Sequence, residues 1–145
     1  MVKETTMPQI RDASAADAGA IAALIRELGD DCEVTPAYAA HYLSCSGNTV
    51  LLCEANAEVI GLVSCSIRPS LFHGGDACLI EDFVVKEGYR GRGVGHALLT
   101  ELVRRAELLG CKEISVSTLP NNTGALRFYR SHGLTDEAVF LEKHL

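Results

Sequence analysis

The chain has 145 residues, of which 48% are hydrophobic, and its formal net charge is −6. This length is typical of one domain with a buried core, so residues 1–145 are expected to form a single domain. The acidic charge argues against a nucleic-acid partner, and no apolar run reaches the 18 residues of a membrane span. The first ten residues contain no apolar signal region, which indicates a cytoplasmic protein.

The first third of the chain predicts one short strand followed by two helices. The strand covers residues 10–12. Ser14, with Asp17 three residues later, forms an acidic capping box that opens a helix over 15–28. A second helix over 36–43 begins with proline at its first position, where the missing N–H costs nothing. Together these helices would lie over one end of a sheet.

The middle of the chain predicts three strands and the longest helix. Two runs rich in β-forming residues, 49–55 and 58–67, are separated by two residues and indicate a hairpin. Residues 68–76 are expected to form a mobile loop because they contain Pro and a Gly-Gly pair. The apolar run 79–85 predicts a central strand. A leucine stripe at helical spacing then predicts a helix over 94–109.

The last third predicts a strand over 113–118, a helix over 122–132 and a final strand over 139–142. The full order is therefore β-α-α-β-β-β-α-β-α-β, which indicates an α/β domain. The six cysteines form no C-x-x-C pair and the five histidines no H-x-x-x-H pair, so no metal site is predicted. The cysteines are expected to be free thiols.

The junction between the strand at 79–85 and the helix at 94–109 predicts an anion site. The first N–H groups of a helix have no intrahelical partner and carry the positive end of the helix dipole. Glycines allow a diphosphate to approach the backbone closely, and two arginines add positive charge. The residues of this expected site are Arg90, Gly91, Arg92, Gly93, Val94 and Gly95.

Three kinds of phosphate-binding loop compete at this junction. A Walker loop needs a Lys-Ser/Thr pair that is missing, and the alternating glycines do not give the Gly-x-Gly-x-x-Gly spacing of a dinucleotide fingerprint. The third pattern is Arg/Gln-x-x-Gly-x-Gly/Ala after an apolar strand, which Arg90, Gly93 and Gly95 match. This is the acyl-coenzyme A loop of the GNAT family of N-acetyltransferases, and the chain resembles that family. A glycine turn that binds no ligand is the alternative.

A second segment, residues 122–133, also resembles a coenzyme A motif of this family. Its Asn122, Ala125 and Tyr129 are three and four residues apart and would share one helical face. The resemblance implies that this face borders the thiol arm and that Tyr129 is the general acid for the departing sulfur. The alternative is that Tyr129 is a core aromatic, as Phe128 is expected to be.

Two adjacent carboxylates, Glu81 and Asp82, are the candidates for removing a proton from the amine. Strand alternation sends them to opposite faces unless a bulge intervenes, and it places Glu81 with Leu79, Phe83 and Val85. The family resemblance favours Glu81 as the base or amine-binding group. Asp82, or a route through water alone, is the alternative.

The resemblance further implies a mixed, mostly antiparallel sheet with helices on both faces, and acetyl-CoA as co-substrate. In this family the fourth and fifth strands splay, so the backbone of Phe83, Val84 and Val85 is expected to bind the pantetheine arm. An N–H group there would act as an oxyanion donor, whose removal typically costs about 3–4 kcal/mol.

The acceptor is expected to be a primary amine of a small molecule, such as an amino sugar, an aminoalkylphosphonate or a polyamine. Segments 80–85, 109–111 and 119–122 are locally similar to glucosamine-6-phosphate N-acetyltransferases, although residues 125–127 are extra relative to that pattern. The short length and the C-terminal sequence are similar to aminoalkylphosphonate and aminoglycoside acetyltransferases. A protein lysine or N-terminal acetyltransferase and a silent acyl-CoA-sensing module are the alternatives. A homodimer is compatible with all of them.

Overall fold

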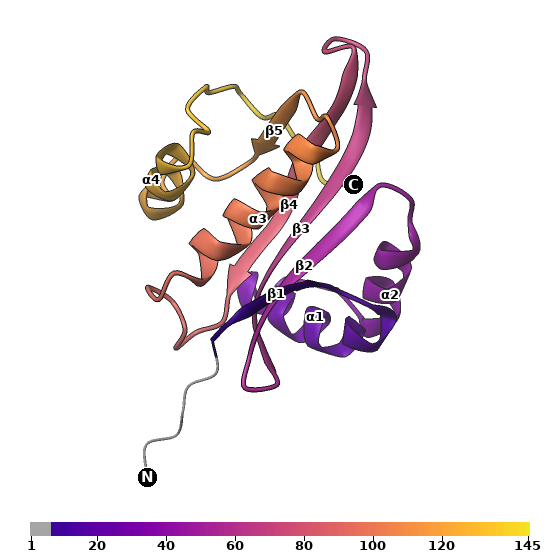
Figure 1. The fold of residues 1–145 in the computed structure, drawn as a ribbon, viewed down its shortest axis with the longest axis vertical. Coiled ribbons are helices and arrows are strands. Elements are labelled where there is room, and N and C mark those ends of the chain that lie inside the picture. The colour runs from indigo at the N-terminus through magenta and orange to yellow at the C-terminus, as the bar shows by residue number, and fades with distance from the viewer. Residues whose placement is uncertain (1–6) are drawn as a thin grey trace.

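The computed structural model describes residues 7–145, and its centre is a five-stranded sheet with the strand order β1-β2-β3-β4-β5 (Figure 1). The strands are β1 (Gln9–Asp12), β2 (Asn48–Ala55), β3 (Glu58–Ser70), β4 (Gly75–Val85) and β5 (Glu113–Val116). Neighbouring strands are antiparallel except β4 and β5, which are parallel. The expected mixed, mostly antiparallel sheet is confirmed.

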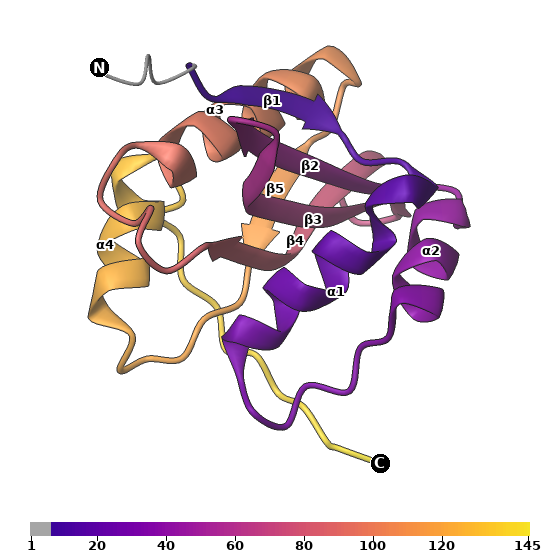
Figure 2. The same ribbon diagram turned by 90° about the horizontal axis from the view of Figure 1, so that it is seen from below.

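Two pairs of helices cover the two faces of the sheet (Figure 2). The helices are α1 (Ala18–Ile25), α2 (Pro36–Ser44), α3 (Val94–Leu108) and α4 (Thr123–Ser131). Short 3-10 turns, Ala15–Asp17 and Arg26–Leu28, extend α1 at its two ends, so the expected helix over 15–28 is present with a tighter first and last turn. None of the helices in residues 7–145 is both long and apolar enough to cross a membrane.

The sheet is buried on both faces, which explains the apolar run in the middle of β2. Leu51 and Cys53 belong to the core cluster under α3, whereas Val50 and Leu52 belong to the cluster under α1 and α2. Successive side chains of a strand point to opposite faces, so a strand covered on both faces is apolar throughout. These two clusters hold the helices of each face in place.

The expected mobile loop over 68–76 is wrong. β3 extends to Ser70 and β4 begins at Gly75, so only residues 71–74 form the turn. Pro69 is tolerated inside β3 because β2 pairs with β3 only as far as Ser66, which leaves this part of β3 at an edge of the sheet. At an edge the missing N–H of proline breaks no ladder hydrogen bond.

The expected last strand over 139–142 is also wrong. Residues 134–145 form neither helix nor strand, and Val139, Phe140 and Leu141 are exposed. A β-rich run becomes a strand only where a neighbouring strand accepts its backbone hydrogen bonds, and this segment pairs with none in the described sheet. The observed order therefore ends at α4.

Asp17 ties the first helical turn to β1. Its carboxylate accepts two hydrogen bonds of 2.9 Å from the guanidinium of Arg11 and one of 2.8 Å from the backbone N–H of Ser14. The hydrogen bonds from Arg11, more than any other interaction, lower the pKa of Asp17 from 3.8 to about 2. A carboxylate whose pKa is lowered by folding stabilises the fold at pH values above its pKa in the unfolded chain. This stability is lost as the pH falls through its pKa in the folded protein.

We therefore expect the Asp17→Asn variant to lose roughly 1 kcal/mol of unfolding free energy at pH 7, the typical value of a helix cap. Wild-type stability should fall between pH 3.8 and about 2, and the variant should fall less over this window. Urea unfolding across this range checks both statements, with the exposed Asp30→Asn as the matched control. Equal stability of Asp17→Asn and wild type at pH 7 would show that Asp17 does not stabilise the junction between β1 and the first helical turn.

Candidate functional site

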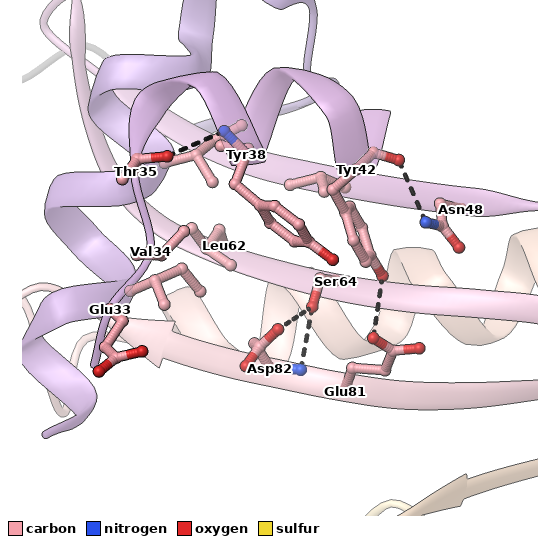
Figure 3. Close-up of a pocket in the computed structure, with 14 residues that line it drawn as sticks. Glu33, Val34, Thr35, Tyr38, Tyr42, Asn48, Leu62, Ser64, Glu81 and Asp82 are labelled. Atoms are coloured by element: carbon pink, nitrogen blue, oxygen red, sulfur yellow. Dashed lines mark hydrogen bonds between the residues drawn. The ribbon is translucent and has the colours of Figure 1, made fainter. Parts of the chain in front are cut away.

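A pocket of about 800 Å³ lies between the α1–α2 pair and the sheet. This volume is within the range of ligand sites in proteins. Figure 3 shows aromatic side chains of α2 above polar side chains of β3 and β4. The described lining residues are Ile21, Ile25, Glu33, Val34, Thr35, Tyr38, Ala39, Tyr42, Asn48, Val50, Leu62, Ser64, Glu81 and Asp82.

A β-bulge brings the two candidate carboxylates into this pocket together. Ser64 of β3 lies opposite Asp82 and the next residue, Cys65, lies opposite Ile80, so Glu81 is an extra residue in β4. The bulge interrupts alternation, and both Glu81 and Asp82 line the pocket.

The expectation that Glu81 shares its face with Phe83 and Val85 is therefore wrong. Both of these residues pack against the core cluster under α3, on the opposite face from the pocket. The bulge adds one residue to β4, and this shifts the alternation of every residue that follows it.

The two carboxylates have different surroundings. Asp82 accepts a hydrogen bond of 2.7 Å from the hydroxyl of Ser64, and its own backbone N–H donates to that hydroxyl at 3.0 Å. Ser64 is only 3% exposed, so Asp82 is held by a buried partner. Glu81 is exposed, and its Oε2 accepts one long hydrogen bond of 3.4 Å from the hydroxyl of Tyr42. Glu81 is therefore the freer of the two to meet a ligand.

Tyr42 lies between the pocket and the backbone of β3. Its hydroxyl contacts the carbonyl oxygen of Cys65 at 3.2 Å as well as Glu81. Burial first, and the negative charge of Glu81 second, raise the pKa of Tyr42 well above its usual value of 10. The phenol therefore stays protonated and can donate a hydrogen bond toward the carboxylate.

The glycine-rich junction forms the open helix end that its sequence predicts. The first intrahelical hydrogen bond of α3 runs from the N–H of Ala97 to the carbonyl of Gly93 at 3.0 Å, so the N–H groups of residues 94–96 have no intrahelical partner. No side chain caps this end within the described chain. Gly91 and Gly93 have φ angles of +76° and +82°, which disfavour any residue with a Cβ.

Side chains around this loop hold it in place and leave its arginines available. The hydroxyl of Tyr89 donates to Glu58 at 3.0 Å, and the guanidinium of Arg92 lies 5.7 Å from the centre of the Tyr89 ring. Arg90 donates from Nε to the carbonyl of Val85 at 3.0 Å. Neither arginine forms a salt bridge within residues 7–145. Their charges can therefore meet an anion.

The second half of β4 lacks a partner on one side. β5 pairs with β4 only from Ala77 to Ile80, whereas β3 pairs with β4 as far as Val85. Residues 81–85 thus have a strand on one edge alone in the described sheet. Phe83, Val84 and Val85 lie in this stretch, as the expected splaying requires, and their contact with a pantetheine arm stays a prediction.

Helix α4 packs on the opposite face from the pocket. The Oδ1 of Asn122 accepts from the N–H of Ala125 at 3.1 Å, so this side-chain oxygen caps the helix. Gly95 faces the ring of Phe128, and a Cβ built on it would lie 3.4 Å from that ring, an ordinary packing distance. His96 and His132 also join the two helices through ring nitrogens 2.8 Å apart.

Tyr129 is only 9% exposed, and its ring packs between Phe83 and Phe128 with centroids 6.2 Å and 5.3 Å away. No buried side-chain oxygen or nitrogen of the described residues lacks a partner, and no hydrogen bond to this hydroxyl occurs among them. The hydroxyl therefore reaches accessible space. Burial raises the pKa of Tyr129 to about 12, so the phenol is protonated at neutral pH.

Comparison with models of known protein families identifies the family of this chain. The model of the Acetyltransferase (GNAT) family matches residues 20–134. The chain belongs to this family. The GNAT family uses acetyl-CoA, and the matched region contains the pocket, the glycine-rich loop and α4. The resemblance drawn from the two sequence motifs is confirmed.

Individual relatives differ in how much of this GNAT chain they match. An aminoglycoside N(6')-acetyltransferase type 1 from Stenotrophomonas maltophilia is 28% identical over 95% of this chain and 94% of its own length. The glucosamine 6-phosphate N-acetyltransferase of Trypanosoma brucei brucei is 33% identical over 55% of this chain and 53% of that protein. The chain spans only 39% of an uncharacterized N-acetyltransferase from Methanocaldococcus jannaschii, at 28% identity over 61% of this chain.

The same fold occurs in solved GNAT structures. The structure of AAC(6')-Iy in complex with a bisubstrate analogue, CoA-S-monomethyl-acetylneamine, has a TM-score of 0.80 to this chain at 22% identity. The match covers 97% of this chain and all of that one. At this level of identity the likeness shows a shared fold.

Sequence reasoning missed several residues of the pocket in this GNAT protein. Tyr38 and Tyr42 are four residues apart in a predicted helix, a spacing that places two aromatic rings on one face. Ser64 is a polar residue inside an apolar strand, which indicates a buried hydrogen bond. Glu33 had no sequence signal, because its place depends on how the segment between α1 and α2 folds.

Proposed function

We propose that this GNAT protein transfers the acetyl group of acetyl-CoA to a primary amine of a small molecule by direct attack. The observation that carries the proposal is the β4 bulge, which places Glu81 and Asp82 in one pocket. The loop over residues 86–93 connects the same strand to the end of α3 that we propose binds the diphosphate. An amine in the pocket would therefore meet a thioester held beside β4.

The proposed reaction begins with removal of a proton from the ammonium group, because an ammonium has no lone pair for attack. Glu81 takes this proton, and Asp82 is the second candidate. The amine nitrogen attacks the thioester carbonyl carbon, and the carbon–sulfur bond breaks with its electron pair moving to sulfur. Tyr129 gives a proton to the departing thiolate, and the acetylated nitrogen releases its second proton to solvent, from which the Tyr129 phenolate is reprotonated. The products are an N-acetylated amine and coenzyme A.

The proposed placement of acetyl-CoA follows the free backbone groups. Its diphosphate would accept hydrogen bonds from the N–H groups at residues 92–95, with Arg90 and Arg92 adding charge. Its pantetheine arm would run along residues 83–85, where β4 has no partner beyond β3. Ala125 on α4 is small enough to leave room for the arm, and Asn122 would border it through the amide nitrogen that the helix cap leaves unused.

Thiol release from acetyl-CoA across a panel of amines tests this function. We expect release with small primary amines and little with lysine peptides or peptide N-termini. Preference for a peptide would instead favour a protein acetyltransferase. Coenzyme A binding without release for any amine would favour a silent acyl-CoA-sensing module.

The Gly93→Ala variant tests the loop. Alanine at a φ of +82° costs about 1–2 kcal/mol of backbone strain. The new Cβ meets no protein atom within 4 Å and would point into the space proposed for the phosphates. We expect affinity for coenzyme A, measured by calorimetry, to fall by roughly tenfold or more, equal to about 1.4 kcal/mol.

Gly110→Ala is the matched control for this variant. Gly110 follows the other end of α3, has a φ of +76° and also has open space around its built Cβ. Both variants should lose similar thermal stability, but only Gly93→Ala should lose affinity for coenzyme A. Equal affinity in the two variants would place the diphosphate elsewhere.

A further inference from the structure

We infer that the acceptor carries at least two separated cationic groups, and that Glu33 binds the one that is not acetylated. The inference rests on the proposed transfer to an amine, and it narrows the class of that amine. Three features of the pocket carry it: the sign of its charges, their spacing, and the aromatic wall between them.

The pocket contains negative charge that no cation balances. Glu33, Glu81 and Asp82 line it, and none of the described lining residues is Lys, Arg or His. Arg26 is nearby, but its guanidinium donates to the backbone carbonyl of Val34 at 2.9 Å and does not line the pocket. Like charges gathered in one site attract a cation and repel a phosphate or phosphonate.

Glu33 is free to bind such a cation. It forms no hydrogen bond or ion pair with another residue of the described chain, whereas Asp82 is held by Ser64. Glu33 belongs to the segment between α1 and α2, and in Figure 3 it lies on one side of Asp82 with Glu81 on the other side. A ligand that contacts both Glu33 and Glu81 must therefore extend along the pocket.

The wall between the two carboxylates suits an extended cationic amine. Tyr38 projects from α2 into the space between Glu33 and Glu81, and Tyr42 lies over Glu81 (Figure 3). Aromatic faces attract ammonium groups and also pack against carbon chains or sugar rings. The volume of about 800 Å³ exceeds the need of one small amine. The pocket thus matches a molecule with one amine at Glu81 and another at Glu33.

Two sources share this chemistry, linear polyamines and sugars with several amino groups. Both carry spaced ammonium groups on an uncharged frame. A phosphorylated amino sugar carries an anion instead, for which the described lining offers no cationic partner. We therefore do not expect this protein to acetylate glucosamine 6-phosphate, the acceptor in the name of the trypanosomal relative.

Isothermal calorimetry with coenzyme A present tests the inference, because coenzyme A has no acetyl group to transfer. The probes are spermidine, neamine, glucosamine and glucosamine 6-phosphate. We expect spermidine or neamine to bind roughly tenfold more tightly than glucosamine, because a second charge-assisted contact adds to the first. Glucosamine 6-phosphate should bind most weakly. Tighter binding of spermidine would identify a linear polyamine as the acceptor, and tighter binding of neamine would identify a sugar with several amino groups.

Glu33→Gln should weaken binding of the better of these two probes by about fivefold to tenfold, since its partner remains partly exposed to solvent. Asp31→Asn is the matched control, because it removes one negative charge from the same segment outside the pocket lining, and it should change affinity by less than about twofold. Unchanged affinity in Glu33→Gln, or tightest binding of glucosamine 6-phosphate, would overturn the inference.

Thiol-release assays separate this inference from the proposed function. Tight binding of spermidine or neamine through Glu33 without thiol release would reject the proposed function and keep the cation site. Equal turnover of all four amines would keep the proposed function and reject the second cation site.

Discussion

The Glu81→Gln variant is expected to release the thiol of coenzyme A about a hundredfold more slowly than wild type at neutral pH, the lower end of the usual range for general-base assistance. Glutamine keeps the shape of the side chain and its contact with the Tyr42 hydroxyl, but it cannot accept the proton of the amine. Because Glu81 is the bulged residue of β4, its backbone position should not depend on its charge. The loss should therefore appear in turnover, with little change in thermal stability.

The pH profile sharpens this test. Raising the pH increases the fraction of free amine, so an enzyme without its base should recover part of its rate as the pH rises. Wild type should gain less over the same range. Glu87→Gln, on an exposed position of the following loop, is the matched control and should retain the wild-type profile.

Asp82→Asn provides the comparison that assigns the base. An asparagine oxygen can still accept the hydrogen bond from Ser64, so this variant removes the charge and keeps the anchor. We expect a smaller loss of turnover than for Glu81→Gln. A larger loss in Asp82→Asn would move the role to Asp82, and full activity of both variants at every pH would leave water as the base.

The parts of the site that follow from local chemistry could be predicted from sequence. A helix start preceded by glycines has free N–H groups wherever it occurs, and Gly91 and Gly93 adopt the positive φ angles that explain why glycine is found there. The leucine stripe of α3 likewise predicts which face is buried. These features depend on neighbours a few residues away.

The parts that depend on distant pairing could not be predicted. Whether Glu81 and Asp82 share a face depends on the register between β3 and β4, and one extra residue at the bulge reverses the answer. The effect of Pro69 also depends on distant pairing. A proline disrupts a strand in the interior of a sheet, but it is tolerated at an edge, where Pro69 lies. The prediction of a strand over 139–142 was wrong for the same reason. The sequence there is typical of a strand, but no strand of the described sheet pairs with it.

The Tyr129→Phe variant is expected to bind acetyl-CoA as wild type does and to turn it over more slowly. The substitution removes the hydroxyl alone, so the ring contacts with Phe83 and Phe128 remain. Coenzyme A is a fair leaving group even without help, so the loss should be about a hundredfold at most, the lower end of the usual range for acid assistance. Binding by calorimetry and steady-state turnover separate the two effects.

The pKa of Tyr129 predicts a second difference between this variant and wild type. Burial raises that pKa from 10.0 to about 12, so the folded protein holds this proton over a range in which the unfolded chain has lost it. Wild-type stability should therefore fall as the pH rises from 10 toward about 12, and the phenylalanine variant should fall less steeply. If the variant shows this flatter profile together with full turnover, Tyr129 is a buried aromatic of the core, and the departing thiolate takes its proton from water.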